Sequence, residues 1–262
     1  MPTSTAEPVR ELRTITPYLI VARADEMLDF VKEAFGAEGM VHGIGSAGGI
    51  HAEARIGDSL LMLGGGGAGA TWQGTPMPSA IHLYVPDVDA VYRRALATGA
   101  TSLRPPADQE YGDRDASIKD AFGNHWYIAT HLGAHYIPEG LHSVNLYLHP
   151  QGADKLVDFL QRAFAAEEVL RHQTPDGVVH HAKVRIGDTI VEMGEAHAEF
   201  QNMPTAVFLS VTDADAVYRR ALEAGATSLF PPDDKPYGRT GGVQDYLGNH
   251  WYMSTQIKDA EK

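Results

Sequence analysis

The sequence predicts an α+β fold built from four βαβββ modules, two in each half of the chain. Two observations lead to this prediction: an ordered internal repeat, and strand-like and helix-like apolar patterns that recur in the same order in both halves. The repeat is clearest in three pairs of segments: His51-Ala-Glu-Ala-Arg-Ile-Gly-Asp with His181-Ala-Lys-Val-Arg-Ile-Gly-Asp, the helical stretches after Asp87 and Asp213, and Gly-Asn-His-Trp-Tyr at Gly123 and Gly248. Because these pairs keep their order, they indicate a tandem duplication.

Within the first copy, apolar periodicity predicts each element in turn. Alternation indicates a first strand, and spacing of three and four residues then indicates a helix that Gly36 ends. Three strands follow, the last two joined by a tight turn at Ile56-Gly57-Asp58-Ser59, and the pattern then restarts. The expected elements are a strand over Thr14–Ala22, a helix over Asp25–Phe35, strands near 40–44, 50–56 and 59–63, a strand over Ala80–Val85, a helix from Asp87 to Gly99, and a last strand over Asn124–Thr130.

The repeat also sets the expected domain limits. We expect one domain over residues 13–132, a linker over 133–139 and a second domain over 140–257. Residues 1–12 and 258–262 are expected to be disordered tails, because chain ends of this composition seldom pack.

Composition narrows the classes of function. The formal net charge is −13, which argues against nucleic acid or an anionic membrane surface as a partner. The chain has no cysteine, so disulfides, thiolate nucleophiles and cysteine-ligated metals are excluded. No apolar run is long enough to span a membrane, and the start of the sequence has no signal-peptide pattern, so a cytoplasmic location is expected.

The element order and three motifs resemble the vicinal oxygen chelate superfamily of glyoxalases, bleomycin-resistance proteins and extradiol dioxygenases. The motifs are Ala34-Phe35-Gly36-Ala37, His51-Ala-Glu-Ala-Arg-Ile-Gly-Asp and Asp120-Ala-Phe-Gly-Asn-His-Trp. The resemblance implies two glyoxalase-like domains whose paired modules form cup-shaped mixed sheets, with helices outside and a ligand inside. It does not imply one reaction, because this fold carries isomerases, dioxygenases and non-catalytic drug binders.

Strand alternation predicts which side chains enter the cups. In Ala80-Ile81-His82-Leu83-Tyr84-Val85, the apolar residues face the helices, so His82 and Tyr84 face the cup. The first cup is expected to contain Thr16, Tyr18, His51, Glu53, Arg55, Met62, His82, Tyr84, His125 and Tyr127. The second cup is expected to contain Ser143, Asn145, Tyr147, His181, Lys183, Arg185, Glu192, Phe208, Ser210, His250 and Tyr252.

Catalytic members of the superfamily hold a divalent metal with His, Gln or Glu side chains on the first and last strands of their modules. The corresponding residues here are Thr16, Met62, Ala80, Tyr127, Ser143, Glu192, Ala206 and Tyr252. Only Glu192 is an ordinary metal ligand, so we expect no cofactor, with a divalent metal as the alternative. A shift of one residue would bring His142 beside Glu192, and a nonstandard site could use His51 with Glu53 or His181 with Glu192.

The sequence therefore favours a glyoxalase-like or bleomycin-resistance-like protein that binds a small organic molecule without the family metal. The alternatives are a metal-dependent lyase, isomerase or dioxygenase, or a metal-free acid–base enzyme that uses His51 and Glu53. The catalytic candidates are His51, Glu53 and Glu192; the expected ligand-binding residues are Tyr18, His51, His82, Tyr84, His125, Tyr127, Tyr147, His181, Glu192, Phe208, Ser210 and Tyr252.

The two cups are expected to differ in chemistry, because Glu53, His82 and Tyr84 become Lys183, Phe208 and Ser210 in the second copy. One cup is therefore expected to bind the ligand, and the other to be altered or closed. The chain is expected to be a monomer that mimics a two-subunit assembly, or a homodimer. Sequence alone leaves open how the modules pair.

Overall fold

A computed structural model describes residues 12–45, 47–198 and 200–256. The expected tails at 1–12 and 258–262 lie outside these residues, apart from residue 12. The chain forms four βαβββ modules, as the periodicity predicted. The first comprises β1 (Ile15–Val21), α1 (Ala24–Phe35), β2 (Glu38–Ile44), β3 (Ile50–Ile56) and β4 (Ser59–Gly65). The second comprises β5 (Ala80–Tyr84), α2 (Val88–Ala97), β6 (Thr101–Asp108), β7 (Asp113–Lys119) and β8 (His125–His131). The third comprises β9 (Val144–Leu148), α3 (Ala153–Phe164), β10 (Glu167–Gln173), β11 (Val179–Ile186) and β12 (Thr189–Met193). The fourth comprises β13 (Ala206–Ser210), α4 (Ala214–Glu223), β14 (Thr227–Lys235), β15 (Gly238–Gln244) and β16 (His250–Thr255).

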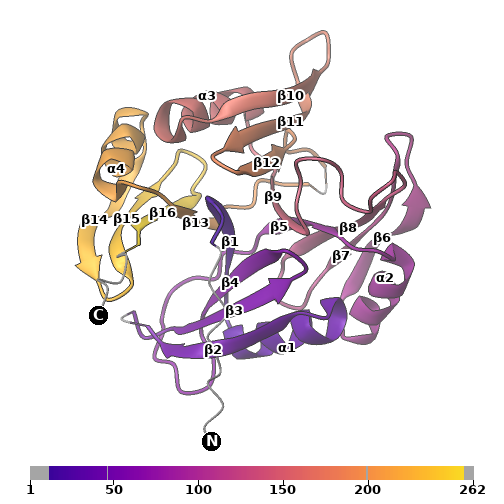
Figure 1. Cartoon of the computed structure of the whole chain (residues 1–262), viewed down its shortest axis with the longest axis horizontal. Coiled ribbons are helices and arrows are strands. Elements are labelled where there is room, and N and C mark those ends of the chain that lie inside the picture. The colour runs from indigo at the N-terminus through magenta and orange to yellow at the C-terminus, as the bar shows by residue number, and fades with distance from the viewer. Residues whose placement is uncertain (1–11, 46, 199, 257–262) are drawn as a thin grey trace, which may run out of the picture.

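The modules pair across the two copies rather than within them. Sheet A has the strand order β14-β15-β16-β13-β1-β4-β3-β2, so it joins the fourth module to the first. Sheet B has the order β10-β11-β12-β9-β5-β8-β7-β6, so it joins the third module to the second. Figure 1 shows sheet A running from the yellow strands near the C-terminus through indigo β1 to β2. The central pairs, β1 with β13 and β5 with β9, are antiparallel, whereas the strands beside them are parallel.

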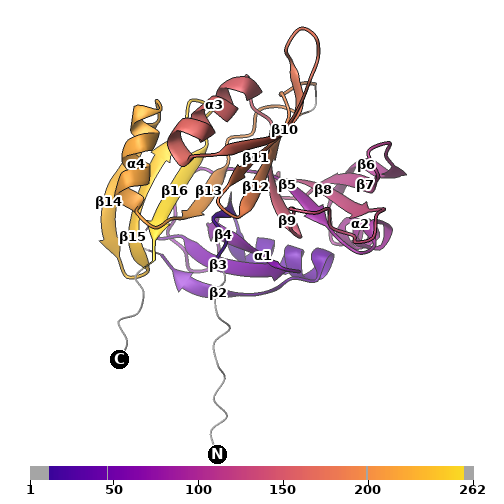
Figure 2. The same ribbon diagram turned by 45° about the horizontal axis from the view of Figure 1, so that its top comes forward.

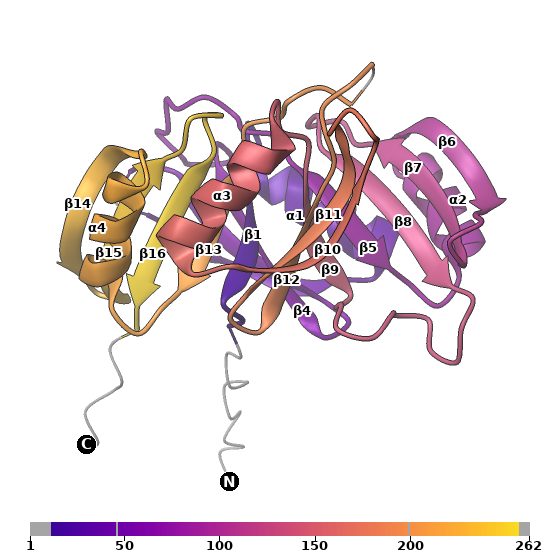
Figure 3. The same cartoon turned by 90° about the horizontal axis from the view of Figure 1, so that it is seen from above.

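The two modules of each copy lie in different sheets, and they contact each other through their helices. Helix α1 packs against α2, and α3 packs against α4. The two helix pairs lie on opposite sides of the molecule, as Figures 2 and 3 show. The Phe35 ring of α1 lies 4.5 Å from the Trp126 ring of β8, and Phe164 lies 4.9 Å from Trp251 in the second copy. Each copy is thus joined by its helix layer, and the two copies are joined by their sheets.

Repeated motifs explain why the same local structure forms in both copies. Asp87 and Asp213 cap α2 and α4 by accepting hydrogen bonds from the backbone N–H groups of Ala90 and Ala216. In the Gly-Asn-His-Trp segments, buried Asp120 and Asp245 accept hydrogen bonds from the indole N–H groups of Trp126 and Trp251. Both tryptophans are fully buried toward the helices. The two motifs therefore anchor the last strand of a module to its helix layer.

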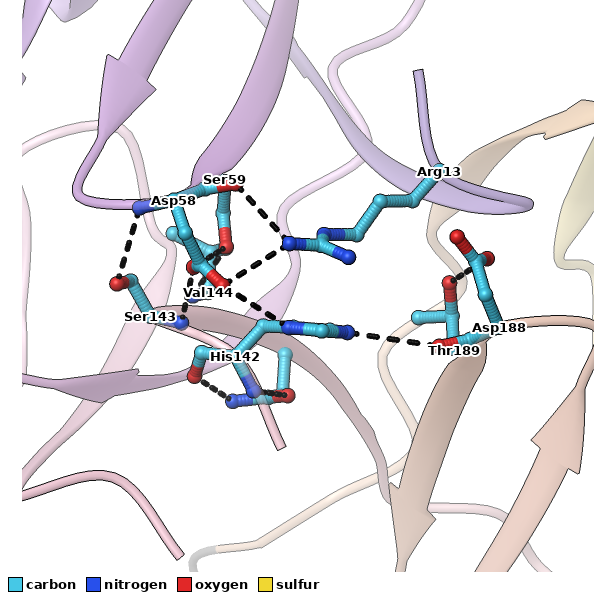
Figure 4. A network of polar contacts seen from close by, with 9 residues as sticks. Arg13, Asp58, Ser59, His142, Ser143, Val144, Asp188 and Thr189 are labelled. Atoms are coloured by element: carbon cyan, nitrogen blue, oxygen red, sulfur yellow. Dashed lines mark hydrogen bonds and ion pairs between the residues drawn. The ribbon is translucent and has the colours of Figure 1, made fainter. Parts of the chain in front are cut away.

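The Ile-Gly-Asp turns form a reciprocal contact between the copies, which we call the clasp; Figure 4 shows its Asp58 half. Asp58 accepts a hydrogen bond of 2.8 Å from the Ser143 backbone N–H, just before β9. Asp188, in the equivalent turn, accepts one of 2.8 Å from the Thr14 backbone N–H, just before β1. Gly57 makes the first contact possible, because a Cβ there would lie 2.1 Å from the Ser143 hydroxyl. The repeated Ile-Gly-Asp motif thus connects each copy to the other by hydrogen bonds.

His142 and Arg13 add side-chain contacts to Asp58, and His142 Nε2 also lies 3.4 Å from the backbone oxygen of Asp188. His142 Nδ1 lies 3.0 Å from the Asp58 carboxylate, and the Arg13 guanidinium lies 2.9 Å from it. Burial alone would raise the pKa of Asp58, but hydrogen bonds from Ser143, Ser59 and His142 outweigh burial and lower it to about 2. The sequence left open whether a shift brings His142 beside Glu192; the structure places it at Asp58 instead.

The fold class is as predicted: α+β, with two mixed eight-stranded sheets and the helices outside. The assignment of residues to cups was wrong, because each sheet takes one module from each copy. The first strands of all four modules offer similar unpaired edges, so the local pattern does not determine which of them pair. No helix among the described residues has the length and apolar character needed to cross a membrane.

Candidate functional site

The open face of each sheet, meaning the face opposite the helices, carries the polar and aromatic residues that alternation predicted. On sheet B this face combines His82 and Tyr127 from the first copy with Tyr147, Lys183 and Glu192 from the second. On sheet A it combines Tyr18 and Glu53 from the first copy with Phe208 and Tyr252 from the second. Both candidate sites therefore need residues from both copies.

Glu192 is the most buried charged group on the open face of sheet B, with an exposed fraction of 1%. Its carboxylate lies 2.8 Å from His82 Nδ1, 3.1 Å from Lys183 Nζ and 3.7 Å from His181 Nε2. Burial alone would raise the pKa of Glu192, but attraction by His82, Lys183 and His181 outweighs burial and lowers it to about 2. Glu192 is therefore an ionised carboxylate whose charge the Lys183 ammonium balances.

His82 has a defined orientation because of this contact. An ionised carboxylate only accepts hydrogen bonds, so His82 Nδ1 must carry the proton that Glu192 accepts. In the neutral imidazole, Nε2 then carries the lone pair. The His82 ring packs on Tyr84 at a centroid distance of 4.4 Å. The geometry produces an imidazole–carboxylate dyad with one residue from each copy.

Tyr84, predicted to bind ligand, is buried and already engaged. Its hydroxyl donates a 3.0 Å hydrogen bond to Asp113, and His131 Nδ1 lies 2.6 Å from the same carboxyl group. Burial, followed by the negative charges of Glu192 and Asp113, raises the pKa of Tyr84 far above its ordinary value. Tyr84 therefore supports the His82 ring rather than offering its hydroxyl to a ligand.

Beside the dyad lies a continuous group of rings, which we call the aromatic wall: Tyr127, Tyr147, His149 and Phe200. Tyr127 lies 5.3 Å from Tyr147, and His149 stacks on Phe200 at 5.3 Å. Burial, followed by the nearby His125 and His197, lowers the pKa of His149 to about 4, so this imidazole is neutral at pH 7. The Tyr127 hydroxyl lies 2.7 Å from His149 Nε2, at hydrogen-bonding distance. The buried Nδ1 of His149 has no hydrogen-bond partner among the described residues.

The open face of sheet A has its own buried carboxylate, Glu53, which is 7% exposed. His42 Nε2 lies 3.0 Å from one carboxylate oxygen, and His51 Nε2 lies 3.6 Å from the other. The two imidazole rings stack at a centroid distance of 5.7 Å. His51 and Glu53 are thus brought together as predicted, and His42 from β2 joins them.

Aromatic rings extend from Glu53 across sheet A. The Tyr18 ring lies 6.1 Å from His51 and 6.1 Å from Tyr252, and Tyr252 stacks on Phe230. Burial, followed by Tyr252 and Tyr237, raises the pKa of Tyr18 to about 12, so its hydroxyl stays neutral. Gly64 is required beneath Tyr18, because a Cβ there would lie 2.4 Å from the Tyr18 hydroxyl.

Strand register shows which residues of the two sheets are equivalent. Tyr18 pairs with Met62 and Tyr147 pairs with Glu192, so Met62 and Glu192 are equivalent. The residue equivalent to Thr16 is therefore Asn145, two before Tyr147, and the alignment of Thr16 with Ser143 was wrong. Ser143 belongs to the clasp, and the slip of two residues arose because it left the strand alternation unchanged.

The residues at the family's metal-ligand positions fall into one group on each sheet. Sheet B offers Asn145, Glu192, Ala80 and Tyr127, and sheet A offers Thr16, Met62, Ala206 and Tyr252. The Asn145 amide bonds to the His142 backbone, so it is already occupied. Over residues 12–45, 47–198 and 200–256, no three or more His, Asp or Glu side chains are grouped in a way that would hold a metal ion.

Several residues of these faces were not singled out from the sequence. His149 follows the alternation of Asn145 and Tyr147, so that signal could have found it. Lys183 was placed in a cup but not recognised as the partner of Glu192. His42, Phe200 and Phe230 lie on edge strands or in a loop, where periodicity gives no signal. His125 and His250 lie at strand starts; His250 contacts the Tyr252 hydroxyl at 3.2 Å.

Paired βαβββ modules whose open faces carry side chains from both copies indicate a class of proteins, and the comparisons with known proteins agree on that class. A model of the Glyoxalase/Bleomycin resistance protein/Dioxygenase superfamily matches residues 12–128 and 146–253, so the chain belongs to this superfamily. Uncharacterized proteins of Mycobacterium bovis and Mycobacterium tuberculosis are 39% identical over 124 residues, which is 44% of this chain and 80% and 72% of those proteins.

Solved structures show the same fold. Glyoxalase I from Zea mays aligns with a TM-score of 0.68 and 15% identity, covering 93% of this chain and 92% of that one. A putative dioxygenase from Bacillus subtilis aligns with a TM-score of 0.60 and 14% identity, covering 92% and 84%. At these identities the likeness extends to the fold and not to the reaction.

Proposed function

We propose that this protein binds a small aromatic organic molecule on the open face of sheet B, in the manner of a sequestering or resistance protein, and holds no family-type metal there. One observation carries the proposal: Glu192, the single carboxylate at the family's ligand positions, is paired with Lys183 and His82. The aromatic wall beside it supplies the apolar surface that small-molecule sites use.

The residues at these positions do not fit a divalent metal. Such an ion needs three or four nitrogen or oxygen donors, whereas these positions of sheet B supply one carboxylate, which lies 2.8 Å from the His82 imidazole and 3.1 Å from the Lys183 ammonium. A divalent cation at Glu192 would have to displace Lys183 or lie beside its positive charge. Ala80 offers no donor, and Asn145 is held by its own backbone. The Lys183 ammonium supplies the positive charge that a metal would otherwise supply.

The aromatic wall supports an aromatic ligand with a hydrogen-bonding group. Tyr127, Tyr147 and Phe200 present ring surfaces, and His149 Nδ1 is a buried polar atom that has no hydrogen-bond partner among the described residues. A buried polar atom left unsatisfied costs about 1–3 kcal/mol, so a ligand group that hydrogen-bonded to it would gain affinity. The bound molecule is therefore proposed to be planar, with a polar group at its edge.

Two measurements test this proposal together. Elemental analysis after purification without chelator should find far less than one nickel, zinc, iron or manganese per chain. A melting-temperature screen with neutral one- and two-ring aromatic amides and phenols should yield a stabilising ligand; at 100 times its dissociation constant, it should add about 2.7 kcal/mol of stability. The shift should be lost in Tyr147→Leu and kept in Tyr18→Leu, the equivalent change in sheet A. One metal per chain that is lost in Glu192→Gln would overturn the proposal.

A metal-free acid–base enzyme is the second candidate, favoured by the His82–Glu192 dyad rather than by His51 and Glu53. The carboxylate fixes the His82 tautomer, and Nε2 can then take a proton from a bound substrate. Turnover of the ligand found above, abolished by His82→Gln but not by Phe208→Gln at the equivalent position, would favour the enzyme over the binder.

A further inference from the structure

One end of sheet B carries two positive side chains on its open face. Strands β8, β7 and β6 form this end, and Figure 3 shows them side by side. Arg104 pairs in register with Ser117, and Ser117 pairs with Tyr127, so these three residues lie in one row on the open face. Lys119 pairs with His125, two residues further along β7 and β8. The Lys119 side chain therefore lies on the same face, and its position is about 7 Å from that row along the strand.

The row that contains Arg104 differs between the two sheets. On sheet A, Phe230 takes the place of Arg104, and its ring stacks on Tyr252 at a centroid distance of 6.1 Å. On sheet B, the Arg104 guanidinium lies 2.7 Å from the buried carboxylate of Asp115. The Tyr111 hydroxyl donates a hydrogen bond of 2.6 Å to the same carboxylate. Asp115 thus orients Arg104, and a guanidinium with five N–H donors can bind a second anionic group at the same time.

The neighbouring pair, Lys119 and His125, also differs from its counterpart. On sheet A, Gln244 takes the place of Lys119, and its amide nitrogen lies 3.3 Å from His250 Nε2. On sheet B, His125 Nδ1 is buried and has no hydrogen-bond partner among the described residues. Burial, followed by the positive charge of Lys119, lowers the pKa of His125, so this imidazole is neutral at pH 7. Sheet B therefore places two cations and an unsatisfied imidazole where sheet A has a phenyl ring, an amide and a bonded imidazole.

We infer that this end of sheet B holds an anionic group of the ligand, and that the ligand is an aromatic carboxylic acid. The inference rests on the function proposed above and names the ligand class. The carboxylate lies between Lys119 and the Arg104 guanidinium, and the rings lie over Tyr127 toward the aromatic wall. Hydrogen bonds between charged partners are about twice as strong as neutral ones, so this place favours a carboxylate over an amide. The formal net charge of −13 does not attract anions, so the selectivity must come from these two side chains.

Isothermal titration of the unaltered protein with 2-naphthoate and its neutral counterpart 2-naphthamide tests the inference. The acid should bind at least about tenfold more tightly than the amide. If the two bind equally, or the amide binds more tightly, and Tyr147→Leu abolishes the binding of both, the inference is overturned while the proposed aromatic site stands. If neither compound binds, or if Tyr147→Leu changes neither affinity, both the inference and the proposed site are overturned.

Matched variants locate the anionic group. Lys119→Gln introduces the residue that sheet A has at this place; it should reduce the affinity for 2-naphthoate by about tenfold and leave that for 2-naphthamide unchanged. Arg104→Gln should act in the same way, and circular dichroism should show that both variants are folded. Lys155→Gln, at an exposed site on α3, removes the same charge far from the open face and should change neither affinity. Equal losses for the acid and the amide in Lys119→Gln, or an equal loss of acid affinity in Lys155→Gln, would overturn the inference.

Discussion

The open faces of sheets A and B occupy equivalent backbone positions but balance charge in different ways. On sheet B, Glu192 lies on β12 and is neutralised within the protein by Lys183. On sheet A, the carboxylate has moved one strand outward to Glu53, and imidazoles are its neighbours. A few substitutions on one face of two strands have therefore changed the electrostatics without changing the fold.

This difference can arise because alternate side chains of a strand lie on different faces. One face packs against the helices, and the other is the open face of the sheet. Side chains toward the helices, such as Leu19, Leu63 and Trp251, are fully buried and keep an apolar character in both copies. Side chains on the open face do not contribute to that core, so they can change after duplication. The two copies therefore share the packing of their helix-facing side chains and differ in the charges on their open faces.

The largest expected effect comes from removing the charge balance of sheet B. Lys183→Met leaves Glu192 buried beside imidazoles only and should lower the free energy of unfolding by about 3 kcal/mol. The double variant Lys183→Met with Glu192→Met should regain most of that loss, because it removes both charges. Urea unfolding of the two single variants and the double variant measures the coupling. Additive single effects would show that the pair is not the source of stability.

Lowering the pH should reduce the stability of the folded protein through His149, which lies on the open face of sheet B. Its pKa in the folded protein, about 4, lies below the value of about 6.5 in an unfolded chain, so the unfolded state binds the proton first. Stability from this group is therefore present above pH 6.5 and declines as the pH falls from 6.5 to 4, amounting to about 2 kcal/mol lost by pH 5. Urea unfolding at pH 7 and pH 5 should show the loss in the unaltered protein and a smaller one in His149→Phe. An identical decrease in both would contradict the assignment.

The clasp should show a smaller asymmetry between the copies. The Asp58 side chain has additional contacts to His142 and Arg13, whereas the Asp188 side chain bonds to Thr14 and Thr189 among the described residues. Asp58→Ala should therefore lower the free energy of unfolding by about 1.5 kcal/mol, and Asp188→Ala by about 1 kcal/mol. Chemical denaturation at low and high salt tests this, since added salt should reduce the difference between the variants. A larger loss in Asp188→Ala would contradict the asymmetry.

Much of the fold could be predicted because its signals are local. Helix periodicity, the Asp87 and Asp213 caps and the Ile-Gly-Asp turns depend on residues close in sequence, and the structure confirms the four βαβββ modules. Alternation likewise indicated that His82, Tyr147 and Glu192 lie on the cup-facing sides of their strands, because neighbouring side chains of a strand point to opposite sides.

Tertiary structure alone decided which modules share a sheet and which charges meet. A first strand presents the same kind of edge to any partner, so nothing local distinguishes β13 from β5 as the neighbour of β1. That choice moved His82 to the face of Glu192 and brought Lys183 into contact with the same carboxylate, although His82 and Glu192 are 110 residues apart. The sequence by itself determined the modules and the orientation of their side chains, and the long-range pairing of strands determined the chemistry of the two sites.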